Sequence, residues 1–326
     1  MSISVTEKEK KITRGIDEDF AEAFKKCELY KLYENHKDEL FIGVRNDYLN
    51  LYYNCDSIAK IEYKNSAIYC EIDKFYLDGL SSKGKEKRYK ITPNQICEQY
   101  EKIKENSDKK TTNEKKAQSK LVLLNNRNEK SKWFCIDVEY VKAFNNQSEK
   151  DKAEFNGRFD IIALSKEKPH KVALIELKYG SGSIGGESGI YKHIKDFSEF
   201  CNKRFFEKHL KQEIIEIINS QIYLDIEVPF ELPNLESILP EPEFYFITLN
   251  NNHNPGKVNA STPKQTMAGY LFKEKRWGCK KLSTKYCVEK DFEDFHATFL
   301  FSKATLTDLE VNDIIEGNYE EKEIPL

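Results

Sequence analysis

The stretch GRFDIIALSKEKPHKVALIELKYG, residues 157–180, decides the fold of this chain. It contains two apolar β-type runs, residues 159–164 and 171–177, on either side of a polar six-residue connection that includes Pro169. Two such runs around a short connection are typical of a β-hairpin. The second run is continuously apolar before its acidic residue, which indicates a strand buried on both faces.

Three charged side chains interrupt this hairpin. Folding about the connection sets Asp160 opposite residues 175–177, and period-two alternation puts Glu176 and Lys178 on one face and Leu177 on the other. Buried charges are costly unless they have a partner or a metal. Mg²⁺ prefers one or two carboxylates together with water and substrate phosphate. The alternative is an ordinary hairpin with a salt bridge between Glu176 and Lys178 on a solvated face.

In the metal-site interpretation, each of these residues has an expected role. Asp160 and Glu176 would bind Mg²⁺, or Mn²⁺, through carboxylate oxygens, and the carbonyl of Leu177 could add a backbone ligand. Lys178 would orient an attacking water or stabilise negative charge that develops on a phosphate. The hairpin therefore predicts a catalytic set of Asp160, Glu176 and Lys178.

Asp160 followed by Glu176-Leu177-Lys178 resembles the D…(D/E)-x-K signature of the PD-(D/E)xK nuclease superfamily. The resemblance covers about residues 114–250, and Phe159 stands where the family often has proline. It implies a restriction-endonuclease-like αβββαβ core with a mixed central sheet. It also implies Mg²⁺-dependent hydrolysis of phosphodiester bonds, mostly in DNA. The expected fold class is therefore α/β (α+β).

Two flanking segments could add further acidic groups to the site. Residues 133–141 predict a strand whose Glu139 would lie beside Asp160 as a possible third carboxylate ligand. Glu139 could equally be a cross-strand partner of Lys178 or Arg158. A helix capped by Asn113 carries Glu114 and Gln118 at i and i+4. In the superfamily the first core helix can bring an acid toward the metal, whereas the helix macrodipole alone also favours a first-turn glutamate.

A glycine-rich loop, residues 180–189, follows Lys178 and leads into a predicted helix that begins at Ser188 or Gly189. Backbone amides at such a helix start can bind a phosphate. His193 and Asp196 share one face of this helix, and the superfamily often has a polar residue here that faces the active site. The alternative for His193 is a surface or boundary position. Candidate nucleic-acid contacts in and around the expected nuclease unit are Arg158, Ser188, Lys192, Lys275 and Arg276.

Two domains are expected from the chain length of 326 residues. Residues 1–110 predict a helix over 16–35 followed by an antiparallel β-meander, and residues 111–326 form the nuclease-like unit. Tyrosines interleaved with lysines in the meander would suit base stacking, although packing of one sheet face explains the same pattern. The later elements expected are helices at 204–224, 262–271 and 306–316 and strands at 244–249 and 295–301.

Composition neither supports nor excludes a nucleic-acid partner. The net charge is −3, with 33% charged residues, and a nuclease needs only a local basic groove. Eight cysteines without a CxxC pair predict reduced thiols in a cytoplasmic protein, and a zinc site from Cys279, Cys287 and His296 is a minor alternative. No signal peptide or membrane span is expected.

The sequence therefore predicts a metal-dependent nuclease that hydrolyses phosphodiester bonds, with DNA as the expected substrate and restriction or anti-phage defence as the expected setting. A homodimer or a defence-system partner protein is compatible with this prediction. The alternative is a catalytically silent nuclease-like module that binds nucleic acid or a protein partner. Retention of Asp160, Glu176 and Lys178 together argues against the silent module.

Overall fold

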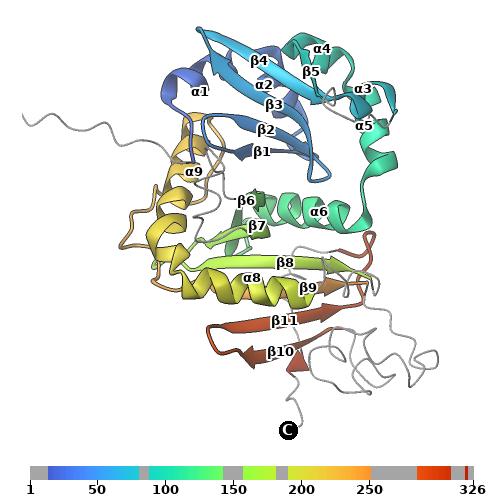
Figure 1. The fold of residues 1–326 in the computed structure, drawn as a ribbon. Helices are drawn as coiled ribbons and strands as arrows, with labels where there is room; N and C mark the ends of the chain where they lie inside the picture. The colour runs from blue at the N-terminus through green and yellow to red at the C-terminus, as the bar shows by residue number, and fades with distance from the viewer. Residues whose placement is uncertain are drawn as a thin grey trace, which may run out of the picture.

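The computed structural model describes residues 14–80, 88–141, 157–180, 190–250, 285–309 and 320–321. The chain forms an α+β structure with two sheets, an antiparallel meander at the N-terminal end and a larger mixed sheet below it in the view of Figure 1. Helix α6 (Asn113–Arg127) lies between the two sheets in this view. The predicted α+β class is confirmed.

The N-terminal unit begins with two short helices rather than the single helix predicted over 16–35. Helix α1 ends at its C-cap residue Lys26, and the break falls at Cys27, whose extended backbone (φ −92°, ψ 151°) makes it the N-cap residue of α2. Five strands then run as an antiparallel meander in the order β1-β2-β3-β4-β5, so the predicted meander is confirmed and gains one edge strand. The elements are α1 (Glu18–Lys25), α2 (Glu28–Asn35), β1 (Leu40–Val44), β2 (Leu49–Tyr53), β3 (Asp56–Lys64), β4 (Ala67–Asp73), α3 (Lys74–Asp78) and β5 (Arg88–Ile91).

A helical connection leads from the meander to the second sheet. It comprises α4 (Pro93–Glu98), α5 (Tyr100–Lys110) and α6 (Asn113–Arg127). Helix α4 starts with a capping box in which the Thr92 and Gln95 side chains bond each other's backbone amides. The cap of α6 is Thr112 rather than the predicted Asn113, because the Thr112 side chain accepts from the amide of Lys115 at 3.3 Å.

The second sheet has seven strands in the order β12-β10-β11-β9-β8-β7-β6. Strands β6, β7 and β8 are antiparallel neighbours, and β9 pairs in parallel with β8 after a helical crossover, as the sequence predicted. Strand β11 pairs in parallel with β9, and β10 and β12 extend the sheet beyond it. The strands are β6 (Trp133–Val141), β7 (Arg158–Ser165), β8 (Val172–Tyr179), β9 (Glu243–Leu249), β10 (Lys285–Asp291), β11 (His296–Ser302) and β12 (Glu320–Glu321).

Helices cover both faces of the mixed sheet (Figure 1). Helix α6 packs Ala117, Leu121 and Val122 against one face, in a core that also contains Leu177. The other face carries α8 (Ile190–Asn202), η1 (Phe206–Leu210) and α9 (Lys211–Tyr223). Because β7 and β8 are covered on both sides, a charged residue within them is removed from water.

The C-terminal predictions have mixed outcomes. The strand expected at 295–301 is β11, whereas the preceding strand β10 was not predicted. The helix expected at 306–316 is wrong over residues 306–308, which form a turn. The carboxylate of Asp308 accepts from the amide of Thr305 at 3.2 Å, and such a local bond favours a turn over a helix. The helix expected at 262–271 lies outside the described residues.

A buried ion cluster joins the N-terminal unit to the mixed sheet. Asp137 of β6 is fully buried and contacts Arg14 at 2.8 Å and Arg45 at 2.7 Å. Arg45 also donates to the hydroxyl of Tyr52 and to the carbonyl of Val138. One hydrophobic core includes residues from both units, so the boundary predicted at residue 110 separates two sheets that share their interior.

Candidate active site

The strands β7 and β8 bring Asp160 to the end of β8, as predicted. Their ladder pairs Ile161 with Ile175, so Asp160 is the next residue out and lies opposite Glu176 and Leu177. The Asp160 Oδ2 atom accepts a hydrogen bond from the amide of Leu177 at 2.8 Å. Because the amide and carbonyl of one strand residue point to the same neighbour, the Leu177 carbonyl lies on the Asp160 side as well.

Glu176 is the centre of a buried charge cluster. Its Oε1 atom lies 2.6 Å from Lys178 Nζ and 2.9 Å from His193 Nε2. Glu176 is fully buried, and Lys178 and His193 are each 2% exposed. The His193 ring is close to Glu176 but poorly aligned for a hydrogen bond, and among the described residues Glu176 Oε2 has no hydrogen-bond partner.

The two carboxylates differ in their pKa values. Burial raises the pKa of Asp160 well above its ordinary value, the charge of Glu176 raises it further, and Lys178 only partly offsets both. Burial also acts to raise the pKa of Glu176, but the contacts with His193 and Lys178 outweigh it and lower the pKa overall. Burial opposes the charge of Lys178, yet Glu176, Asp160 and Glu114 hold its pKa above the ordinary value. Burial, together with the neighbouring negative charge, thus raises the pKa of Asp160, while the cationic contacts of Glu176 lower the pKa of its partner.

Helix α6 supplies a third acidic side chain. Glu114 Oε1 lies 3.5 Å from Lys178 Nζ, and Glu114 Oε2 accepts from the amide of Tyr179 at 3.4 Å. Gln118, one turn further along α6, is 1% exposed, and its Oε1 has no hydrogen-bond partner among the described residues. The structure thus brings Glu114 to the predicted set and buries Gln118 on the same helix.

Strand β6 places Glu139 opposite Asp160, because the residues on either side of it pair with Ile161 and Phe159. The backbone of Glu139 has φ +51°, an uncommon value for a residue other than glycine, and the β6–β7 ladder shifts register nearby. Among the described residues, Glu139 pairs with Lys115, whose Nζ lies 3.7 Å from Glu139 Oε1. Lys115 was absent from the sequence-based set, since no motif marks it.

The residues around Glu176 meet part of what a divalent cation requires. No group of three or more His, Cys, Asp or Glu side chains within the described ranges is placed to hold a metal ion together. Magnesium, however, often uses only one or two protein carboxylates and keeps its waters. Asp160 and Glu176 meet that smaller requirement, and the unpartnered Glu176 Oε2 is a buried oxygen that a cation would satisfy.

Only some of the predicted nucleic-acid contacts lie among the described residues. Arg158, at the start of β7, is exposed. Its pKa is raised, because the charges of Glu139, Asp160 and nearby glutamates outweigh partial desolvation. Lys192 is exposed and pairs with Asp196 at 3.3 Å. Ser188, Lys275, Arg276 and Cys279 lie outside the described residues.

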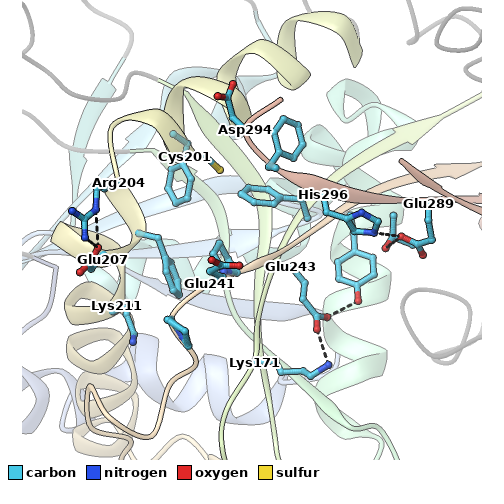
Figure 2. A pocket seen from close by; sticks show the side chains of 18 residues that line it. Lys171, Cys201, Arg204, Glu207, Lys211, Glu241, Glu243, Glu289, Asp294 and His296 are labelled. Carbon is cyan, nitrogen blue, oxygen red and sulfur yellow. Dashed lines mark hydrogen bonds and ion pairs between the residues drawn. The ribbon is translucent and has the colours of Figure 1, made fainter. Parts of the chain in front are cut away.

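A cavity lies at the end of the strands opposite the candidate site. It has a volume of about 1140 Å³ and includes Lys171, Glu243 and His296, which stand at or beside the starts of β8, β9 and β11. Figure 2 shows that several of its charged side chains pair with one another, among them Lys171 with Glu243 and His296 with Glu289. Lys171 contacts Glu243 at 2.7 Å, and His296 contacts Glu289 at 2.7 Å. These pairs are at least partly exposed, in contrast to the buried set around Glu176.

Comparison with known proteins gives no relative. No protein-family model, curated protein or solved structure matches this chain. Within the described residues no helix is long and apolar enough to cross a membrane. Within the described segments, none of the seven cysteines is joined to another by a disulfide.

Proposed function

We propose that this chain is a divalent-cation-dependent phosphodiesterase. Within that class, a nuclease with DNA as its substrate accounts best for the residues at the end of β8. The proposal also joins the chain to the PD-(D/E)xK superfamily, whose signature Asp160, Glu176 and Lys178 resemble. Restriction or anti-phage defence is the setting we infer for such an enzyme.

One observation carries the proposal. Two carboxylates that are both at least 98% buried, Asp160 and Glu176, meet at the end of neighbouring strands, and one oxygen of Glu176 has no partner in the described structure. Buried carboxylates without enough donors are costly, so a pair of this kind needs a proton or a cation. The raised pKa of Asp160 reports the same deficit.

The surrounding residues have roles that follow from their contacts. Asp160, Glu176 and the Leu177 carbonyl would hold the cation, which would polarise the phosphate and lower the pKa of a bound water. Lys178 stands 2.6 Å from Glu176, where its ammonium can orient a water and stabilise negative charge on the phosphate. Arg158 is exposed at the edge of this set and suits a phosphate contact.

A second candidate function has an observation of its own. The ammonium of Lys178 already neutralises Glu176, and no larger group of potential metal ligands occurs in the described ranges. Both features favour a catalytically silent module that binds nucleic acid or a protein partner. Cleavage measurements separate the two candidates directly.

The test is incubation of the purified protein with linear, circular and single-stranded DNA and with RNA, in Mg²⁺, Mn²⁺ or EDTA. We expect cleavage that requires the cation. Glu176→Gln and Lys178→Met should each lower the rate by about a hundredfold to a thousandfold, the usual cost of losing one electrostatic stabiliser. Phosphate contacts elsewhere should preserve much of the nucleic-acid affinity.

Glu243→Gln is the matched control. Glu243 is also a strand glutamate paired with a lysine, Lys171, but at the opposite end of the sheet. The Glu243→Gln protein should cut nucleic acid at the wild-type rate. Folded Glu176→Gln protein that also cuts at that rate would refute the assignment, and nucleic-acid binding without cleavage in any cation would favour the silent module.

A further inference from the structure

Lys115 connects the N-terminal meander to the candidate active site. Its Nζ donates to the carbonyl of Cys55 at 3.2 Å and to Asp56 Oδ1 at 3.1 Å, both at the turn between β2 and β3. The same ammonium faces Glu139 Oε1 at 3.7 Å. The Lys115 ammonium is therefore shared between the meander and the Glu139 carboxylate, which lies opposite Asp160.

The two sides of this contact are held differently. Asp56 is 7% exposed and fixed from its other oxygen, which accepts from the hydroxyl of Thr111 at 2.7 Å. The side chain of Glu139, by contrast, makes no hydrogen bond to another described residue, and 3.7 Å is an ion-pair distance beyond hydrogen-bond length. The turn fixes Lys115, and Lys115 acts on Glu139 through charge.

We propose that Lys115 is a positioning residue whose ammonium holds the Glu139 carboxylate away from the Asp160–Glu176 pair until a divalent cation displaces that ammonium from Glu139. In this proposal the β2–β3 turn sets how strongly Lys115 holds Glu139. The inference rests on the proposed function, because it assumes that the pair binds a cation. Lys115 opposes metal binding in two ways. It competes for the Glu139 carboxylate, and its charge repels a cation that approaches.

The arrangement makes the meander a regulator of the site. Asp56 and Glu139 compete for one ammonium, so weakening either contact strengthens the other. A ligand or partner that shifted the β2–β3 turn would change the affinity for the cation without touching a metal ligand. The N-terminal unit thus has a role in the chemistry that no motif in its sequence indicates.

The experiment is calorimetric titration of Mn²⁺ into the full chain without nucleic acid. Lys115→Met should tighten Mn²⁺ binding by about tenfold, the lower end of the effects that neighbours of metal ligands have. Asp56→Asn should weaken binding, since Glu139 is then the one carboxylate of the two that still attracts the Lys115 ammonium. In the double variant the effect of Asp56→Asn should disappear, because both changes act through one ammonium.

Lys116→Met is the control. Lys116 neighbours Lys115 on α6 but donates to the carbonyl of Asp108 at 3.0 Å, so its removal should leave Mn²⁺ binding unchanged. Melting curves in EDTA check that each variant folds. If Lys115→Met does not fold, the weaker binding expected of Asp56→Asn and its reversal in Asp56→Asn with Lys115→Gln carry the test.

The outcomes separate this inference from the proposed function. Wild-type protein that binds Mn²⁺, together with unchanged or weaker binding in Lys115→Met, overturns the role of Lys115 alone. Weakening by Asp56→Asn that persists when Lys115 is replaced overturns the coupling to the turn. Failure of the wild type to bind Mn²⁺, with or without nucleic acid, removes both proposals.

Discussion

Replacing Asp160 with asparagine should stabilise the metal-free protein while it abolishes activity. Asp160 is 2% exposed, and burial together with the charge of Glu176 raises its pKa well above the ordinary value. The folded state therefore binds the proton more tightly than the unfolded state does. The ionised form of this carboxylate is therefore costly in the folded state, and asparagine removes that charge while its carbonyl can still accept from the amide of Leu177.

The size of the gain follows from opposing contributions. Each unit by which a folded-state pKa exceeds the unfolded value corresponds to about 1.4 kcal/mol at pH values above both. Loss of the attraction to Lys178 works in the other direction. We expect a net gain of about 1–2 kcal/mol, which is common when a destabilising functional group is removed. For a chain of this size that is a rise in Tm of about 2–6 °C.

The assay is thermal melting of wild-type and Asp160→Asn protein in EDTA across a pH series. The advantage of the variant should be greatest above the folded-state pKa of Asp160. It should shrink as the pH falls through that value, because the wild-type carboxyl is then neutral in the folded protein. Equal Tm values at neutral pH, or an advantage that grows on acidification, would refute the reasoning.

Three further outcomes are expected. Mg²⁺ or Mn²⁺ at about 100 times its Kd should stabilise the wild type by about 2.7 kcal/mol in thermal melts and should not stabilise Asp160→Asn. Arg45→Met should destabilise the protein by about 3–5 kcal/mol in urea titrations, because Asp137 loses a buried partner, whereas the exposed Arg88→Met should change stability by less than about 0.5 kcal/mol. His193→Ala should slow cleavage less than Lys178→Met does, since His193 meets the proposed catalytic set through the carboxylate of Glu176, and an equal loss in single-turnover rates would contradict this.

The sequence predicted the parts of the fold that depend on short-range pattern. The alternation of residues in 159–178 predicted the hairpin, its register and the separation of Leu177 from Glu176 and Lys178 onto opposite faces. These features follow from strand period and connection length alone. The parallel pairing of β9 with β8 follows from the helices between them.

Other features depend on contacts that no local pattern encodes. The helix expected over 16–35 breaks at Cys27, although its apolar spacing is continuous, because the chain turns there to bury both halves. Strand β6 contains both the positive φ of Glu139 and a register shift, and no pattern in the sequence indicates either of them. Lys115 reaches the site only because the β2–β3 turn lies against α6. Long-range packing decides each of these cases.

The ion cluster at Asp137 has a consequence for any attempt to dissect the protein. A fragment that started at Thr111 would keep every residue of the proposed catalytic set. It would also leave Asp137 without Arg14 or Arg45, and α6 without Tyr52 and Cys55 packed against it. An uncompensated buried charge and an uncovered apolar surface both favour aggregation over folding. A minimal catalytic fragment cannot therefore be cut at the boundary between the sheets, and the meander must be supplied with it, covalently or as a separate chain.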